Sequence, residues 1–307
     1  MRRARVISGL AFALLFNLHP PLQAQPTPDE LAKIKAAVPE KASAPAASPR
    51  KLLVFSRSWG YKHSAIPYGK AAAQFMAEKT GAFAVTISDD DAAFEPKNLA
   101  PFDAVFFNHV NNEVFLPENY ATLPADQQAK ARERDAMLKK SFVEFLSLGK
   151  GLAVIHAGVA AFREWPEYGK IMGARFDNHP WVEGSTVTLK VSDPGSPLTK
   201  AFGTTPFVIT DEVYQFKEYS RDQLRVLLSV DPERTDFVRV RSAIHRTDGD
   251  FALSWVKKYG EARIFYSAIG HQHELYWNPI VLQSFLDGIQ FALGDLKAPT
   301  DSLPLLK

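Results

Sequence analysis

Short, largely apolar runs alternate with amphipathic stretches through the first half of the chain. Four runs of four residues have the composition of strands, at 52–55, 84–87, 104–107 and 152–155. The first of them is apolar at every position, which is typical of a strand buried on both faces. Amphipathic periodicity predicts helices at 67–80 and 126–148. Since strands and helices alternate, right-handed crossovers should build a parallel sheet with helices on both faces.

The second half of the chain shows a different pattern, in which strands follow one another closely. Five strands are expected, at 185–191, 207–210, 225–229, 251–259 and 263–267. The third and fourth of these are predicted to pair with each other. A helix over 279–293 should begin after the cap residue Asn278 and close the domain. The whole pattern predicts one α/β domain with antiparallel strands added to its parallel sheet.

The first 24 residues have the composition of an export signal. Arg2, Arg3 and Arg5 precede a short apolar run at 7–18, and a cleavage site is expected before Gln25. The apolar run is too short to span a bilayer comfortably, so a cleaved signal peptide at 1–24 is favoured over a stable membrane anchor. We therefore expect the mature protein to be periplasmic or secreted.

A segment rich in Pro, Ala and Ser follows at 25–49. Only 28–38 has the pattern of a helical turn or two, with Thr27 as the cap. The remainder has little to bury, so the segment is predicted to be a disordered linker. The folded domain is then expected at 50–297, with a C-terminal tail at 298–307.

Composition and missing motifs limit the chemistry. The chain has no cysteine, which excludes disulfides, thiolate metal sites and cysteine nucleophiles. Its net charge is +2 over 307 residues, with acids and bases interspersed and no basic stripe that would suit nucleic acid. There is no glycine-rich dinucleotide fingerprint and no Walker loop, so no nucleotide cofactor is expected. The Gly-x-Ser-x-Gly elbow of serine hydrolases is missing too.

Histidines stand close to the ends of several predicted strands. His63 lies in the loop after the first strand, and His109 and His156 directly follow two others. His271 comes just after the last predicted strand. In an open parallel sheet the binding crevice lies beyond the carboxyl ends of the strands. A single histidine is usually a structural or surface residue, but four of them at one sheet edge predict that some share a site.

Polar residues in the second half are candidates to complete such a site. His179 stands in an Asn-His-Pro run, and Asp211 and Glu212 follow an apolar run, at the predicted end of a strand. An acid there can ligate a metal or act as a general base. The ordinary alternative is that Asp211 caps a turn and that Glu212 is solvated. Histidine and carboxylate without cysteine suit Zn, Mn or Fe, and Zn is the default for hydrolysis at neutral pH.

Several short segments form a recognisable ordered set. They are Tyr-Lys-His-Ser at 61–64, Gly-Leu-Ala-Val-Ile-His-Ala at 151–157, Phe-Asp-Asn-His-Pro at 176–180, Asp-Glu-Val-Tyr at 211–214, and Trp-Val-Lys-Lys-Tyr-Gly at 255–260 with Gly-His beyond it at 270–271. The set resembles the ThuA-like, trehalose-utilisation family over roughly residues 51–296. One departure is Lys62, where the family more often has arginine, so the resemblance does not extend to an anion-clamping arginine at that position.

The resemblance implies a flavodoxin-like fold of the class I glutamine amidotransferase type, with a doubly wound parallel sheet. Amidotransferases of that fold carry a cysteine nucleophile on the elbow after a central strand, and His156 corresponds to that elbow here. Histidine cannot form the thioester intermediate, so amidotransferase activity is not expected. The family implies a role in carbohydrate metabolism, with trehalose, related disaccharides or their keto forms as substrates.

These observations favour a carbohydrate-active enzyme of hydrolase, lyase or isomerase type, with a small-molecule sugar as its partner. The expected catalytic residues are His63, His156, Glu212 and His271. The expected ligands of a divalent metal, zinc by default, are His156, His179 and His271. The expected substrate-binding residues are Trp59, Trp165, Tyr214 and Asn108.

Two other functions stay open from the sequence alone. A carbohydrate-binding module without turnover would stack aromatic rings on pyranose faces. The rings available for this are Trp59, Trp165, Trp181, Tyr276 and Trp277. An interaction protein could keep the fold without its chemistry, because fold alone does not determine function. The sequence leaves the oligomeric state open, including a homo-oligomer.

Overall fold

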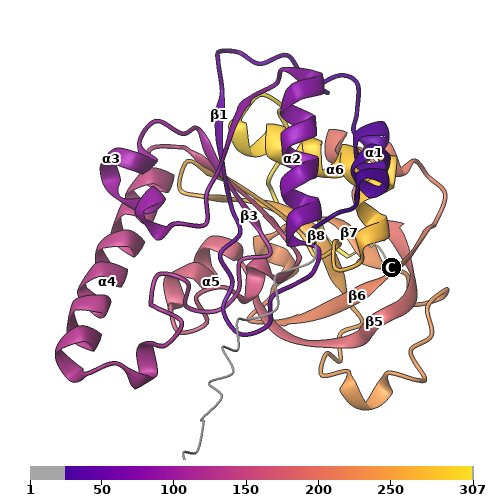
Figure 1. The fold of residues 1–307 in the computed structure, drawn as a ribbon. Helices are drawn as coiled ribbons and strands as arrows, with labels where there is room; N and C mark the ends of the chain where they lie inside the picture. The colour runs from indigo at the N-terminus through magenta and orange to yellow at the C-terminus, as the bar shows by residue number, and fades with distance from the viewer. Residues whose placement is uncertain (1–24, 306–307) are drawn as a thin grey trace, which may run out of the picture.

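A computed structural model describes residues 25–305 of the chain, and its centre is one nine-stranded sheet (Figure 1). The spatial order of the strands is β2-β1-β3-β4-β9-β8-β7-β5-β6. Their bounds are β1 Lys51–Phe55, β2 Ala84–Ile87, β3 Ala104–Asn108, β4 Gly151–Ile155, β5 Arg175–Val191, β6 Phe207–Lys217, β7 Arg225–Val230, β8 Ala252–Tyr259 and β9 Ala262–Ser267. The run from β2 to β9 is parallel, and the run from β9 to β6 is antiparallel. This confirms the predicted fold class and the predicted pairing of β7 with β8.

Helices cover both faces of the parallel half (Figure 1). Within the described part of the chain the α-helices are α1 Pro28–Ala37, α2 Ile66–Thr80, α3 Pro96–Leu99, α4 Ala125–Ser147, α5 Pro166–Met172 and α6 Pro279–Leu293. Successive side chains of β3 show the two layers, because neighbours on a strand point to opposite faces. Phe106 lines a small internal cavity together with residues of α2 and α6. Phe107 instead packs against Phe142 of α4, with ring centroids 5.5 Å apart.

The strands predicted at 185–191 and 207–210 are parts of two longer strands. β5 begins already at Arg175, and β6 runs on to Lys217. The first half of β5 has irregular pairing with β6, with register shifts between Phe176 and Ser185. Such bulges break the apolar–polar alternation that signals a strand, and they bend the ribbon. Asp211 and Glu212 therefore lie inside β6, which corrects their predicted place at a strand end.

The segment 25–49 differs from the disordered linker that its composition predicted. Thr27 caps α1 as expected, and Ile34 of this helix is fully buried. Beyond the helix, the backbone N–H of Ser43 donates to Gln290 of α6 at 2.8 Å, and the Ser43 hydroxyl donates to Asp287. The segment has too few apolar residues to fold alone. It is ordered because the sheet domain buries Ile34 and provides hydrogen-bond partners for Ser43.

The two ends of the chain are only partly within the described residues. The expected signal peptide at 1–24 lies outside them, as do residues 306–307 of the expected tail. Among residues 25–305, no helix has both the length and the apolar character needed to cross a membrane.

Candidate active site

The carboxyl ends of four parallel strands bring four histidines together. His63, His109, His156 and His271 follow β1, β3, β4 and β9 respectively, and all four are buried. The ring of His63 lies 4.9 Å from that of His156 and 5.2 Å from that of His271, between centroids. The rings of His156 and His271 are 5.1 Å apart. Segments up to 208 residues apart in sequence thus meet at one sheet edge, the place where such sheets bind ligands.

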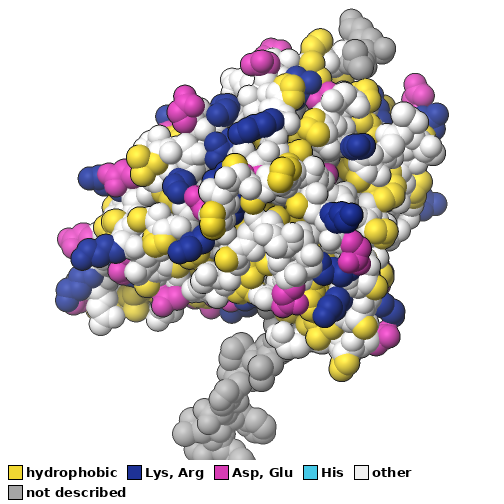
Figure 2. All heavy atoms as spheres, turned by 90° about the horizontal axis from the view of Figure 1, so that it is seen from above, with side chains coloured by type: hydrophobic (Ala, Val, Ile, Leu, Met, Phe, Trp, Pro, Cys, Tyr) yellow, Lys and Arg dark blue, Asp and Glu magenta, His cyan; other side chains and the backbone are white. Residues whose placement is uncertain are grey.

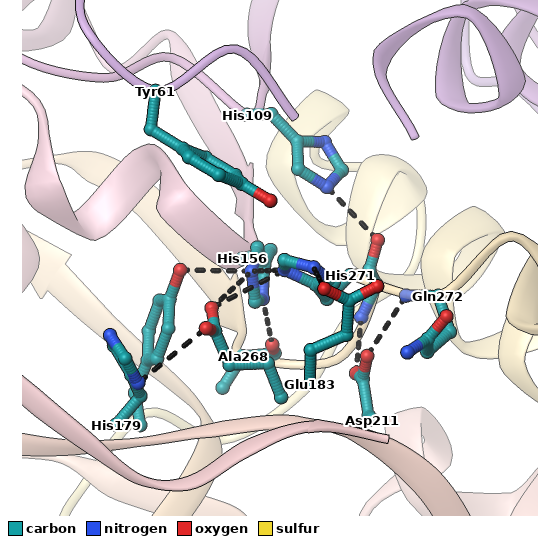
Figure 3. A network of polar contacts seen from close by, with 12 residues as sticks. Tyr61, His109, His156, His179, Glu183, Asp211, Ala268, His271 and Gln272 are labelled. Carbon is teal, nitrogen blue, oxygen red and sulfur yellow. Dashed lines mark hydrogen bonds and ion pairs between the residues drawn. The ribbon is translucent and has the colours of Figure 1, made fainter. Parts of the chain in front are cut away.

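His156 stands on a strained turn at the end of the central strand β4. Its φ is +46°, a left-handed conformation that non-glycine residues rarely adopt and that tends to mark functional sites. The Nδ1 atom of His156 lies 2.8 Å from the carbonyl oxygen of Ala268, so this nitrogen is the donor. The Nε2 atom lies 2.8 Å from the Tyr214 hydroxyl, which can donate to it when the ring is neutral. The fold therefore points Nε2 of His156 into the site, towards Tyr214 (Figure 3).

Glu212 reaches the histidines from β6. Its Oε2 atom lies 3.4 Å from His156 Nε2 and 3.3 Å from His271 Nδ1, and its side chain is only 12% exposed. Burial alone would raise the pKa of Glu212, but the adjacent His156 and His271 outweigh it and lower that pKa. Burial alone would lower the pKa of His271, whereas the Glu212 carboxylate raises it. Glu212 and His271 therefore each stabilise the charged form of the other.

The neighbouring acid, Asp211, points to the opposite side of β6 and has a different task. Its side chain is fully buried and accepts the backbone N–H groups of Gly270 at 2.8 Å and Gln272 at 3.0 Å (Figure 3). These two bonds hold the loop that carries His271 between them. Asp211 thus fulfils the capping role that was one alternative in the sequence, while Glu212 is not solvated.

Three histidines and one acid form a group with the geometry of a metal site. One ligand atom from each of His63, His156, Glu212 and His271 can be chosen so that all four lie within 4.8 Å of one another. The atoms His156 Nε2, His271 Nδ1 and Glu212 Oε2 are 3.2, 3.4 and 3.3 Å apart in pairs. Donor atoms bound to one zinc ion at about 2.0–2.1 Å in a tetrahedron lie about 3.3–3.4 Å apart. The residues present therefore fit a divalent metal ion.

Residues around this group hold its donors in a state suited to metal binding. Burial lowers the pKa of His63, and the neighbouring histidines lower it further, so this ring stays neutral. His156 donates a hydrogen bond to Ala268 O, and Glu183 lies 3.7 Å from His271 Nε2. Contacts of this kind orient metal-bound histidines.

One of the metal ligands predicted from the sequence lies outside this group. His179 is not in the four-residue group; its Nδ1 lies 3.5 Å from Glu212 Oε1, and its side chain is 46% exposed. The group contains His63 and Glu212 in its place. The bulged first half of β5 leaves His179 at the rim of the site, beside the acid that does belong to the group.

Of the four predicted substrate-binding residues, only Tyr214 lines the cavity above the histidines. Trp59 donates its indole N–H to Leu116 O and lines a different cavity. Trp165 packs on Phe162. Asn108 is fully buried and donates to Ser56 and to Ile66 O. Trp59, Trp165 and Asn108 therefore do not line this cavity, although each lies close in sequence to a residue that does.

The cavity itself has a volume of about 420 Å³, within the range of about 300–1,000 Å³ typical of small-molecule sites. Residues of its wall that the sequence patterns did not indicate are Tyr61, Asn111, Phe176, Val182 and Glu183. Tyr61 and Phe176 stand in the segments that carry the family resemblance, and this was the available signal for them. Glu183 had none, because its approach to His271 depends on the bend of β5.

His109 belongs to the framework of the site and not to its open part. Its Nδ1 lies 2.9 Å from Asn108 Oδ1 and its Nε2 lies 2.9 Å from the carbonyl oxygen of Gly270. Complete burial lowers the pKa of this ring well below its usual value. Like Asp211, His109 contacts the loop that carries His271, so it supports that loop from the side of β3.

A doubly wound, flavodoxin-like sheet with a histidine–carboxylate site at its carboxyl edge defines a class of α/β proteins, and comparison with known proteins identifies the family. The profile of the ThuA family, described as trehalose utilisation, matches residues 51–292, so the chain belongs to this family. Two solved structures of ThuA-like proteins have a similar fold. The one from Bacteroides uniformis has a TM-score of 0.55 and 19% identity, over 78% of this chain and 91% of that one. The one from Parabacteroides merdae has a TM-score of 0.55 and 18% identity, over 84% and 98%. No curated protein sequence matches the chain.

Proposed function

We propose that this protein is a metal-dependent enzyme that acts on a disaccharide or keto-sugar, and that zinc is its metal. One observation carries the proposal: His63, Glu212 and His271 line a cavity of ligand size, and the buried His156 completes the group of four that they form. The trehalose-utilisation family supports a sugar as the substrate. Four buried donors without a shared ligand would be costly to keep together, because each must give up its hydration.

The residues of the site suit proton transfer beside a polarised sugar oxygen. A divalent ion, when bound, would act as a Lewis acid on such an oxygen. Tyr214 is buried, which raises its pKa well above the usual value, so it stays a neutral donor next to His156. His179 at the rim can exchange a proton with solvent, and it contacts Glu212 directly. His179 is thus the acid–base residue of the proposal, and Glu212 contacts it while serving as a metal ligand.

The binding-module alternative is less well supported by the aromatic residues. Trp181 and Tyr276 are buried in the core, with 2% and 0% exposure. Trp59 has Arg57 over its ring at 4.6 Å. The five rings proposed for stacking therefore do not form one open platform.

We also propose export of the mature protein, which N-terminal sequencing of the purified protein would test.

Metal content and turnover of two variants test the enzyme proposal together. We expect about one zinc ion per wild-type chain, loss of it in His156→Ala and His271→Ala, and loss of turnover of trehalose or 3-keto-trehalose in both. His245→Ala is the matched control, because this histidine is 57% exposed and outside the cluster. Wild-type rates and metal content in His156→Ala would refute the proposed site. Binding of sugar that survives chelation, without turnover, would favour the binding module.

A further inference from the structure

A second, smaller cavity adjoins the candidate active site. It has a volume of about 140 Å³ and shares Ala160, Arg163 and Phe176 with the wall of the larger cavity. A water molecule occupies about 30 Å³ in the liquid, so the space suits a group of a few heavy atoms. Nothing in the proposed reaction uses it.

Three cations line this smaller cavity: Arg163, Arg175 and Lys217. The one acid in its wall, Asp177, already has His245 at 2.7 Å. Within residues 25–305, no carboxylate lies within 4.0 Å of the cationic nitrogens of Arg163 or Lys217. Arg175 has a single long contact of 3.9 Å, to a Glu218 side chain that is 63% exposed. On the face in Figure 2, by contrast, basic and acidic side chains are interspersed.

Neutral groups hold the two arginines in place. Arg163 donates from Nε to the carbonyl oxygen of Ala160 at 3.2 Å, and its guanidinium lies 5.4 Å from the ring centroid of Phe176. Arg175 donates to the carbonyl oxygen of Arg163. These contacts fix the positions of the side chains but do not neutralise their charge. A planar guanidinium fork is well matched to a carboxylate or a phosphate.

We propose that this cavity binds an anionic group of the substrate, so that the preferred substrate is a disaccharide or keto-sugar bearing a carboxylate or a phosphate, of which trehalose and 3-keto-trehalose are neutral analogues. The inference rests on the proposed function for the reacting end of the sugar, and on Arg163, Arg175 and Lys217 for the anionic end. Because Arg163 lines both cavities, one ligand can reach the histidine cluster and the cations together.

Calorimetric titration of the metal-loaded, full-length mature protein tests this, with D-glucuronate, D-glucose 6-phosphate and D-glucose as probes. We expect the wild type to bind one anionic sugar at least about tenfold more tightly than glucose, since charged hydrogen bonds contribute about that factor or more. The comparison of the two anionic probes distinguishes a carboxylate from a phosphate. The double variant Arg163→Gln/Arg175→Gln should lose about 10–100-fold in affinity for the anionic sugar and little for glucose.

Two controls separate an anion held by the arginines from an anion held by the metal or by general surface charge. Arg239→Gln removes an arginine whose side chain is 89% exposed, outside both cavities, and should change nothing. Chelation could abolish the preference for the anionic sugar while the arginine variant retains it. In that case the metal holds the anion, and the proposal is overturned. Equal affinity for charged and neutral sugars would overturn it as well. If His156→Ala keeps full turnover while the arginine variant loses anion binding, the proposed function fails and the anion site stands.

Discussion

Asp211 offers the sharpest test of how the site is assembled. Replacing it by asparagine keeps the shape of the side chain but leaves one oxygen for two backbone donors, those of Gly270 and Gln272. A hydrogen bond to a charged group contributes about 1.5–3 kcal/mol, and a buried donor without a partner costs about 1–3 kcal/mol. Burial also raises the pKa of Asp211, so the neutral amide recovers part of this loss. The net expectation is a loss of about 2 kcal/mol in the free energy of unfolding.

The variant should also weaken metal binding, because the loop between the two lost contacts carries His271. Contacts that orient metal ligands are typically worth about 10–100-fold in affinity, and we expect a loss of zinc affinity in that range. Urea denaturation of the metal-free protein and competition with a zinc chelator measure the two effects separately. Asp211→Asn should therefore lose stability and metal affinity together.

Asp236→Asn is the matched control for Asp211→Asn. Asp236 also accepts two backbone N–H groups, from Val238 and Arg239, but its side chain is 50% exposed. Water can replace its bonds, so the cost should stay below about 1 kcal/mol. If the two variants have the same urea midpoint and Asp211→Asn keeps wild-type zinc affinity, Asp211 does not hold the His271 loop in the way inferred from its two bonds.

Three further predictions concern the fold around the site. Asp250 is buried and paired with Arg221 at 2.6 Å. Burial opposes its ionisation, but the bond to Arg221 prevails and lowers its pKa, so this stability is fully present above the unfolded pKa of about 4 and is lost as the pH falls below that value through the lower pKa of the folded state. Asp250→Asn should cost about 3–5 kcal/mol in urea at pH 7 and less at about pH 2, and an equal loss at these two pH values would contradict the pairing. Gly151→Ala places a Cβ 2.0 Å from the carbonyl oxygen of Ala292. We expect a loss of about 1–3 kcal/mol or more in the free energy of unfolding, seen as a lower melting temperature. An unchanged melting temperature would contradict this packing. Ile34→Ala should lower the free energy of unfolding by about 2–5 kcal/mol, because Ile34 of α1 is fully buried. An unchanged urea midpoint would show that segment 25–49 is a linker and not part of the domain.

Local patterns were sufficient to predict most of the fold. The apolar runs that became β1, β3 and β4 are buried on both faces, so their signal is strong and does not depend on context. The cap at Asn278 is equally local, since its side chain accepts the N–H groups of Ile280 and Val281 two and three residues on. The first half of β5 and the place of Glu212 inside β6 were missed, because bulges interrupt the alternation from which strands are recognised.

The amino-acid sequence by itself determined the fold class, the family resemblance and the presence of histidines at strand ends. Each of these follows from the order of residues along the chain, since a parallel strand delivers its next residue to a known edge of the sheet. The tertiary structure decided which side chains share the site. It brought Glu212 from β6 against His156 and His271, left His179 at the rim and turned Trp59 and Trp165 away. Such contacts depend on the bend of β5 and β6 and on the hydrogen bonds of Asp211, and these join segments that are distant in the sequence.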